Sequence, residues 1–338
     1  MPNSLSMPDI HSIGRSAGDF QQPVSREQMI AICRRAFGAS VDVESAVELG
    51  GGQYNSTYRV DLRGEGPVIV LIAPEPYRQF RLERGLMRNE HASVPYLAPI
   101  ADFMPRTLAV DFTHDLINRD YLIQTHLVGV PAPEGLAAYP REKHGSFWED
   151  LGRILARVHS VTGPGFGRTQ GPHFGTWSAA IESTLDDIAA DLEETGLVAD
   201  DVRQVGALVA AQRWSLDEIS QPVLLHGDLW IGNVMLAADT TEPRISGVFD
   251  CDRTSWGDPM ADWTMFLIAR RAQDETAAFW HGYGRRPEIT EGARIRSHAY
   301  RARSIGESRL EYHRLHDSSS IAQTYVEMAQ VLTELTDP

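Results

Sequence analysis

The stretch Leu225–Leu236 constrains the fold of this chain more than any other part of the sequence. It reads Leu-His-Gly-Asp-Leu-Trp-Ile-Gly-Asn-Val-Met-Leu, with Asp228 and Asn233 five positions apart and short apolar runs at both ends. Apolar runs around a polar segment indicate buried strands or helix ends that hold a rigid loop. A second apolar run, over 245–249, ends at Asp250. The pattern therefore predicts polar side chains fixed on loops between buried elements.

The spacing of these polar residues is typical of phosphoryl transfer. In kinases, an aspartate accepts the proton of the hydroxyl acceptor, and an asparagine five positions later holds a metal ion. A further aspartate at the end of the next strand supplies the second ligand. Oxygen ligands of this kind suit Mg²⁺. We therefore expect Asp228 to be catalytic, and Asn233 and Asp250 to bind Mg²⁺ on the phosphates of a nucleotide.

The segment from His226 to Asn233 resembles the His-Gly-Asp-x-x-x-x-Asn motif of the aminoglycoside phosphotransferase and choline kinase-like family. Phe249-Asp250, Gly257-Asp258-Pro259 and Asp262 resemble the metal-binding segment of that family and the residues that follow it. Both parts occur in the right order, and the resemblance extends from about Gly50 to the helix after Asp262. It implies an α+β, protein-kinase-like fold of two lobes. The small N-lobe would carry an antiparallel β-sheet and one main helix, and the larger C-lobe would be mostly α-helical.

The resemblance also divides the chain. Residues 25–128 would form the nucleotide-binding N-lobe, and residues 129–338 the C-lobe with the catalytic loop, the metal ligands and the acceptor site. Residues 1–24 are rich in Ser, Pro, Gly and Asp, and are expected to form a flexible tail. Two residues are expected to support the catalytic loop, His226 and Asp258. Two others are candidates for substrate contact, with a structural role as the alternative, Trp230 and Arg253.

A glycine-rich stretch, Gly50-Gly51-Gly52, separates two predicted strands over 43–49 and 58–62. A plain hairpin turn is the simplest interpretation. Because the stretch precedes the catalytic loop, as in kinases, we interpret it as a flap over the nucleotide phosphates. Its expected contacts are Gly51, Gly52, Asn55, Ser56 and Thr57. After a strand over 121–127, the expected hinge residues beside the purine are Gln124, Thr125 and His126.

The sequence departs from the family pattern at the third strand, over 68–73. The family carries Lys or Arg there to hold the phosphates, but Leu71 occupies the place. A helix is expected over 77–97. It would put Arg81, Arg84 and Arg88 on one face, because they are three and four positions apart. We expect one of them to replace the strand cation, with Arg81 and Arg84 favoured over Arg88. The alternative is altered nucleotide choice or a weaker grip on phosphate.

Glu90 lies where the family has the helix glutamate that orients the strand cation. Since Leu71 replaces that cation, two interpretations of Glu90 stay open. Either it supports the active site in the usual way, or it is an ordinary solvated residue of the helix.

The composition narrows the classes of partner that the protein could bind and the compartment in which it could function. The net charge of −15 disfavours nucleic acid, which binds basic surfaces, and is compatible with a cationic substrate as well as with simple solubility. The two cysteines, Cys33 and Cys251, are far apart and favour a reducing compartment. We see no membrane-spanning run and no signal peptide. We therefore expect a cytoplasmic protein with no membrane association and no obligate protein partner.

Together these features predict a small-molecule O-phosphotransferase that uses ATP or GTP with Mg²⁺. The favoured acceptor is an antibiotic hydroxyl (aminoglycoside, macrolide or a nucleoside antibiotic such as capuramycin), which would serve resistance or self-protection. The alternatives are a metabolite kinase for choline, a sugar or an amino alcohol, and a non-catalytic nucleotide-binding regulator, which Leu71 keeps open. A protein kinase is disfavoured because Asp250 does not begin Asp-Phe-Gly and no Ala-Pro-Glu segment follows.

Overall fold

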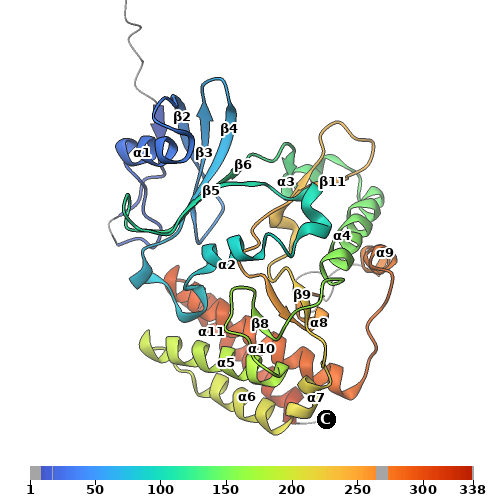
Figure 1. Cartoon of the computed structure of the whole chain (residues 1–338). Helices are drawn as coiled ribbons and strands as arrows, with labels where there is room; N and C mark the ends of the chain where they lie inside the picture. Colours follow the sequence, from blue (N-terminus) through green and yellow to red (C-terminus); the bar gives the residue numbers. More distant parts are fainter. Residues whose placement is uncertain (1–8, 17, 264–272, 337–338) are drawn as a thin grey trace, which may run out of the picture.

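The computed structural model describes residues 9–16, 18–263 and 273–336 (Figure 1). The first part of the chain forms a six-stranded sheet in the order β1-β2-β3-β4-β6-β5, in which only the β1–β2 pair is parallel. The strands are β1 (Asp9–His11), β2 (Val43–Leu49), β3 (Ser56–Leu62), β4 (Gly66–Ile72), β5 (Thr107–Asp111) and β6 (Tyr121–Thr125). The predicted antiparallel sheet is confirmed, with one additional strand at its edge.

The two faces of this sheet have different neighbours, because successive side chains of a strand point to opposite faces. On β4, Val68, Val70 and Ile72 belong to a core cluster shared with helix α1 (Arg26–Phe37). The alternate residues Ile69, Leu71 and Ala73 belong to a separate cluster that includes Met87 of helix α2 (Leu86–Ser93). Leu71 therefore faces α2, which lies between the sheet and the C-lobe (Figure 1).

The prediction of one long helix over 77–97 is wrong. The chain instead forms two 3₁₀ turns, η1 (Pro76–Arg78) and η2 (Arg81–Glu83), before the short helix α2 begins. Gly85 separates the turns from the helix, because it adopts a left-handed conformation with φ of 72° that an α-helix cannot continue through. The three arginines of this region consequently do not share one helix face.

The prediction of a flexible tail over 1–24 is also wrong for the residues that the structure describes, 9–16 and 18–24. Residues 9–11 form β1 against β2, and the backbone amide of Ile13 donates a hydrogen bond to Glu48 at 2.8 Å. The side chain of Gln21 donates to the carbonyl oxygens of Gly52 and Asn55. Composition did not reveal this order, because the segment is held by contacts with distant strands and has no periodic pattern of its own. Residues 1–8 and 17 lie outside the described residues.

The second part of the chain is mostly helical, as predicted. Apolar side chains on α4, at 147, 151, 154 and 158, follow the helical repeat and lie in the main core. Thr176 and Thr290 cap the first turns of α5 and α10 through their hydroxyl groups. The helices are α3 (Ala132–Gly135), α4 (Gly145–Val158), α5 (Trp177–Glu194), α6 (Asp200–Ala211), α7 (Arg213–Asp217), α8 (Pro259–Trp263), α9 (Gln273–Tyr283), α10 (Glu291–Arg314) and α11 (Ser318–Thr336).

Two small antiparallel sheets interrupt these helices and carry the central loops. One has the order β11-β10-β7 and the other β8-β12-β9. Their strands are β7 (Val130–Pro131), β8 (Gly167–Arg168), β9 (Val223–Leu225), β10 (Val234–Leu236), β11 (Ile245–Val248) and β12 (Ser255–Gly257). The remaining 3₁₀ turns are η3 (Ala98–Phe103), η4 (Leu136–Ala138), η5 (Arg141–Lys143) and η6 (Ile231–Asn233). Among the described helices, none is long and apolar enough to cross a membrane.

Ion pairs connect the lobes through the turns that precede α2. Arg81 pairs with Asp191 and Glu194 on α5, and Arg314 at the end of α10 pairs with Glu83. The Arg314 guanidinium also lies over an aromatic ring of the N-terminal segment, 3.7 Å from the centroid of Phe20. These contacts fix the position of α2 relative to the C-lobe.

Candidate active site

The predicted catalytic loop begins where β9 ends, and a buried aspartate holds it in shape. The carboxylate of Asp262 accepts hydrogen bonds from the backbone amides of His226 and Gly227, at 2.8 and 2.9 Å. His159 lies 3.1 Å from the same carboxylate and 2.8 Å from the hydroxyl of Tyr283. The sequence placed Asp262 in the segment that resembles the family, but no local pattern assigned it a role. Its contacts identify it as the main brace of the loop.

Gly227 is required by the close approach of two chain segments. Its φ is 83°, and a Cβ atom there would lie 2.2 Å from the carbonyl oxygen of Arg253. Only glycine tolerates both conditions. The preceding residue, His226, is fully buried beside the Cys251 thiol at 3.3 Å, and burial lowers the pKa of His226 to about 4. The neutral imidazole therefore packs inside the loop, as expected of a supporting residue.

Asn233 and Asp228 contact each other directly. The side-chain amide of Asn233 donates to the backbone carbonyl and to the carboxylate of Asp228, at 2.8 and 3.0 Å. Strands β10 and β11 pair with Val234 opposite Val248, and the amide of Phe249 donates to the carbonyl of Asn233 at 3.1 Å. This register puts Asp250 at the same end of the hairpin as Asn233. Asp250 itself has a left-handed backbone, with φ of 64°.

Carboxylates dominate the charge of this site. Burial raises the pKa of Asp228 to about 7, with the nearby charges of Arg253 and Asp252 acting in opposite directions. The pKa of Asp250 is raised well above its usual range, by burial first and then by Asp252, Asp228 and Glu90. Sequence reasoning missed Asp252, which is 4% exposed, although the Asp-x-Asp spacing was a signal. Such a cluster of buried acids favours a bound cation.

The residues of the site fit Mg²⁺. The amide oxygen of Asn233 and the carboxylate of Asp250 are hard oxygen donors at one end of a hairpin. Within the described residues, no three His, Cys, Asp or Glu side chains are grouped so as to hold a metal ion alone. Mg²⁺ commonly binds one or two carboxylates and takes its other ligands from substrate phosphates and water. The donor set therefore suits an ion that arrives with a nucleotide.

Arg253 is close to the catalytic loop, since its carbonyl oxygen faces Gly227 and its charge acts on Asp228. Its buried guanidinium loses solvation, but Glu307, Asp252, Asp228 and Glu83 together raise its pKa above the usual value. Glu311 on α10 is also near, and its pKa is raised by burial although Arg253 opposes the shift. Trp230, the other candidate for substrate contact, is 45% exposed and has its ring against Gly232. Two half-buried carboxylates of α10, Glu307 and Glu311, therefore lie near Arg253.

The glycine-rich turn lies between β2 and β3, as predicted. Gly51 has φ of 99°, and Gly51 and Gly52 are exposed. The side-chain oxygen of Asn55 is buried without a hydrogen-bond partner. Ser56 instead uses its hydroxyl to bond the carbonyl of Gln22, so it is engaged by the N-terminal segment. Thr57, the second residue of β3, lies opposite Leu71 of β4. A role of this turn in nucleotide binding stays a prediction.

The expected hinge residues end β6. Gln124 is buried opposite Ile69, and the hydroxyl of Thr125 accepts a hydrogen bond from the amide of Arg106 at 2.9 Å. His126 is half-buried, and burial, together with the charge of Arg59, lowers its pKa. The hydroxyl and the backbone amide of Thr125 are thus both bonded to Arg106, and a role of this segment in purine binding stays a prediction.

Glu90 fits neither of its two sequence interpretations. It is 7% exposed, so it is not a solvated residue. It also has no strand cation to orient, and burial with the neighbouring Asp252 raises its pKa to about 8. Asn89, which sequence reasoning missed, is fully buried beside it and donates to the carbonyl oxygens of Asp252 and Thr254, both at 2.8 Å. No local pattern marks Asn89, because its partners are distant in sequence.

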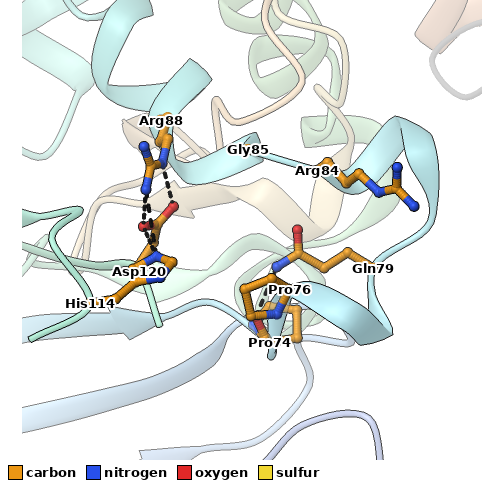
Figure 2. A pocket seen from close by; sticks show the side chains of 8 residues that line it. All are labelled: Pro74, Pro76, Gln79, Arg84, Gly85, Arg88, His114 and Asp120. Carbon is orange, nitrogen blue, oxygen red and sulfur yellow. Dashed lines mark hydrogen bonds and ion pairs between the residues drawn. The ribbon is translucent and has the colours of Figure 1, made fainter. Parts of the chain in front are cut away.

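The two favoured arginines, Arg81 and Arg84, do not share a helix face and have different surroundings. The guanidinium of Arg81 is occupied by two carboxylates of α5. Arg84 is exposed and points away from the ion-paired group of Arg88, Asp120 and His114 (Figure 2). These side chains line a cavity of about 360 Å³ that contains none of the catalytic-loop residues. The helix face on which the replacement cation was predicted is absent, because the helix is broken at Gly85, and a phosphate contact of Arg81 or Arg84 stays a prediction.

The geometry thus joins a braced His-Gly-Asp loop, an Asp–Asn contact and a second aspartate at a strand end. The sequence pattern of the phosphotransferase enzyme family matches residues 45–298. The chain belongs to this family. It is a phosphotransferase with an alcohol group as acceptor, as the sequence predicted. No curated protein matches the chain by sequence.

Solved structures show that this phosphotransferase has the protein-kinase-like two-lobe fold. A thermostable mutant of aminoglycoside phosphotransferase APH(4)-Ia, in a ternary complex with ADP and hygromycin B, is similar with a TM-score of 0.63 at 18% identity, covering 91% of this chain and 98% of that one. The GDP and kanamycin complex of APH(2")-IIia has a TM-score of 0.58 at 13% sequence identity, covering 90% of this chain and 97% of that one. A putative aminoglycoside phosphotransferase from Ralstonia eutropha has a TM-score of 0.59 at 15% sequence identity, covering 92% of this chain and 96% of that one.

Proposed function

We propose that this phosphotransferase moves the γ-phosphate of ATP or GTP to a hydroxyl group of an antibiotic, and so serves resistance or self-protection. The observation that carries the transfer step is the contact of Asn233 with Asp228 beside Asp250. Phosphoryl transfer depends on positioning and charge neutralisation more than on covalent chemistry. A rigid loop with these three side chains provides the positioning.

The roles of the residues follow from their contacts. Asp228 would accept a hydrogen bond from the acceptor hydroxyl and take its proton as transfer proceeds. Asn233 and Asp250 would hold Mg²⁺, which neutralises charge on the phosphates. Asp262 keeps the loop amides in place. Asp258, which accepts from Arg296 at 3.0 Å, fastens the segment to α10.

The two carboxylates of α10 near Arg253 support an acceptor that carries amino groups as well as hydroxyl groups. The charge of Glu307 acts on Arg253, the charge of Arg253 acts on Glu311, and Glu307 also pairs with Arg303 at 3.6 Å. Carboxylates bind ammonium groups through charge-assisted hydrogen bonds. Two of the similar structures hold hygromycin B and kanamycin. An aminoglycoside is therefore the acceptor class we favour over a macrolide or a nucleoside antibiotic.

A screen of acceptors and donors tests the proposal. Purified protein with Mg²⁺ would be offered ATP or GTP and one acceptor from each class, with phosphorylated products identified by mass spectrometry. The acceptors are an aminoglycoside, a macrolide, a nucleoside antibiotic, choline, a sugar and an amino alcohol. We expect transfer to the aminoglycoside, and none from the Asp228→Ala variant. Transfer to choline, sugar or amino alcohol alone would instead establish a metabolite kinase.

A further inference from the structure

Glu90 lies on the buried face of α2 that looks towards β4. Met87, one helical turn earlier, belongs to the cluster that contains Leu71. Residues three apart on a helix share a face, so Glu90 points to the side on which the strand cation of the family would stand. Leu71 is 7% exposed and carries no charge to offer. The position of the carboxylate is thus retained although its usual partner is absent.

Asn89 fixes Glu90 against the metal-binding segment. Its amide donates to the carbonyl oxygens of Asp252 and Thr254, and accepts from the Thr169 hydroxyl at 2.8 Å and the Gln170 amide at 3.1 Å. These four bonds use the full hydrogen-bonding capacity of the side chain. Helix α2 is therefore fastened directly to the segment that begins at Asp250, without an ion pair between strand and helix.

The carboxylate of Glu90 has been left without a partner in this position. Its Oε2 atom is buried with no hydrogen bond, and the one charge that acts on its pKa is that of Asp252, which has the same sign. Of the arginines on the sheet, Arg59 pairs with Asp61 and lies near His126, at the hinge end. A buried carboxylate beside other carboxylates is costly unless a cation is added. The nucleotide phosphates would add further negative charge.

We propose that Glu90 is a ligand of a divalent cation that binds together with the nucleotide, between Glu90 and Asp250, and supplies the positive charge that Leu71 cannot. This inference rests on the proposed function, because the phosphates complete the coordination. Mg²⁺ sites built from one or two carboxylates and phosphate oxygens are common. Asn233 and Asp250 would hold the other ion.

The experiment counts bound Mn²⁺, a substitute for Mg²⁺ with an electron paramagnetic resonance signal. Full-length protein saturated with a non-hydrolysable ATP or GTP analogue would be titrated with Mn²⁺. We expect two ions per wild-type complex. In Glu90→Gln the weaker ion should bind at least about tenfold less tightly, so that one ion is counted at a Mn²⁺ concentration that fills both wild-type sites. Leu71→Lys should also bind one ion, because the new ammonium would pair with Glu90. Glu275→Gln, a buried acid on α9, is the matched control and should keep two.

The outcomes separate this inference from the proposed function. Two ions in Glu90→Gln, or a wild-type complex that binds only one ion, would overturn the inference. In the latter case Asp250→Asn should still remove that single ion, which would leave the proposed function standing. If wild-type protein bound no Mn²⁺ with either analogue, the proposed function would fail too. Glu90→Gln preserves size and polarity, so its folding is checked by circular dichroism and the decision does not depend on Leu71→Lys.

Discussion

The side-chain amide of Asn233 donates one hydrogen bond to the backbone carbonyl of Asp228 and another to its carboxylate, at 2.8 and 3.0 Å. Both bonds use the amide nitrogen, so the amide oxygen can serve as a metal ligand while the nitrogen orients the catalytic carboxylate. Under the proposed function, one residue would thus couple the hydroxyl acceptor to the metal ion. The five-residue spacing matters because the short turn η6 returns the chain to within hydrogen-bond distance.

Replacement of the catalytic aspartate should affect chemistry alone. In Asp228→Ala we expect kcat to fall by ~10²–10⁴, the usual contribution of a positioned base. Nucleotide affinity and the circular dichroism spectrum should stay close to wild type, because Asp262 still braces the loop. Steady-state kinetics and calorimetry provide the measurements. Turnover near the wild-type rate would exclude Asp228 as the base.

Loss of a metal ligand should change how nucleotide binding depends on Mg²⁺. In Asp250→Ala we expect weaker nucleotide binding at saturating Mg²⁺, and little further loss when Mg²⁺ is removed. The reason is that the carboxylate contributes only through the ion it holds. Calorimetric titrations with and without Mg²⁺ measure both quantities. A variant that kept the wild-type dependence on Mg²⁺ would show that Asp250 is not a ligand.

The buried amide of Asn89 should support both stability and nucleotide binding. Asn89→Ala removes its hydrogen bonds to Asp252 and Thr254 and leaves their carbonyl oxygens unpaired, which should cost about 3 kcal/mol of unfolding free energy. Nucleotide affinity should also fall, since α2 is no longer fastened to the metal-binding segment. Chemical denaturation and calorimetry check these effects. The adjacent Arg88→Ala, which removes an exposed pair with Asp120, should cost at most about 1 kcal/mol.

The ion pair between the lobes should be a stability element. Arg314→Ala leaves the buried carboxylate of Glu83 without its cation and removes the contact over Phe20, so we expect a loss of about 3 kcal/mol in chemical denaturation. Arg203→Ala, which breaks exposed pairs with Glu193, is the control and should change stability by less than about 1 kcal/mol. Equal effects of the two substitutions would argue against a special role for Arg314.

The buried imidazole of His226 should make stability depend on pH. Its pKa in the folded protein, about 4, is below the ordinary value of 6.5, so the unfolded state binds more protons between these values. The stabilisation is therefore full above pH 6.5 and is lost as the pH falls towards 4, by up to about 3 kcal/mol. The raised pKa values of Asp228 and Glu90 act in the opposite direction, so the test is the difference in unfolding free energy between wild type and His226→Gln, which should shrink from pH 7 to 5. The exposed His11→Gln should leave the pH dependence of wild type unchanged.

The catalytic residues could be predicted from the sequence because their relation is local. Asp228 and Asn233 are joined by one loop, and the hairpin that follows brings Asp250 back to the same end. Short-range spacing between buried strands is enough to define such a group. The glycine-rich turn was found in the same way, since its flanking strands pair with each other.

Only the tertiary structure decided what surrounds these residues. Asn89, Asp262 and the pair of Arg81 with Asp191 act on partners far away in sequence, so no local pattern marks them. The helix expected after β4 failed for a related reason. A single left-handed glycine, Gly85, redirects the chain and gives each arginine a different partner. The sequence by itself determined the chemistry of the loop, whereas long-range packing determined which charges stand beside it, because buried charges are placed by contacts between distant elements.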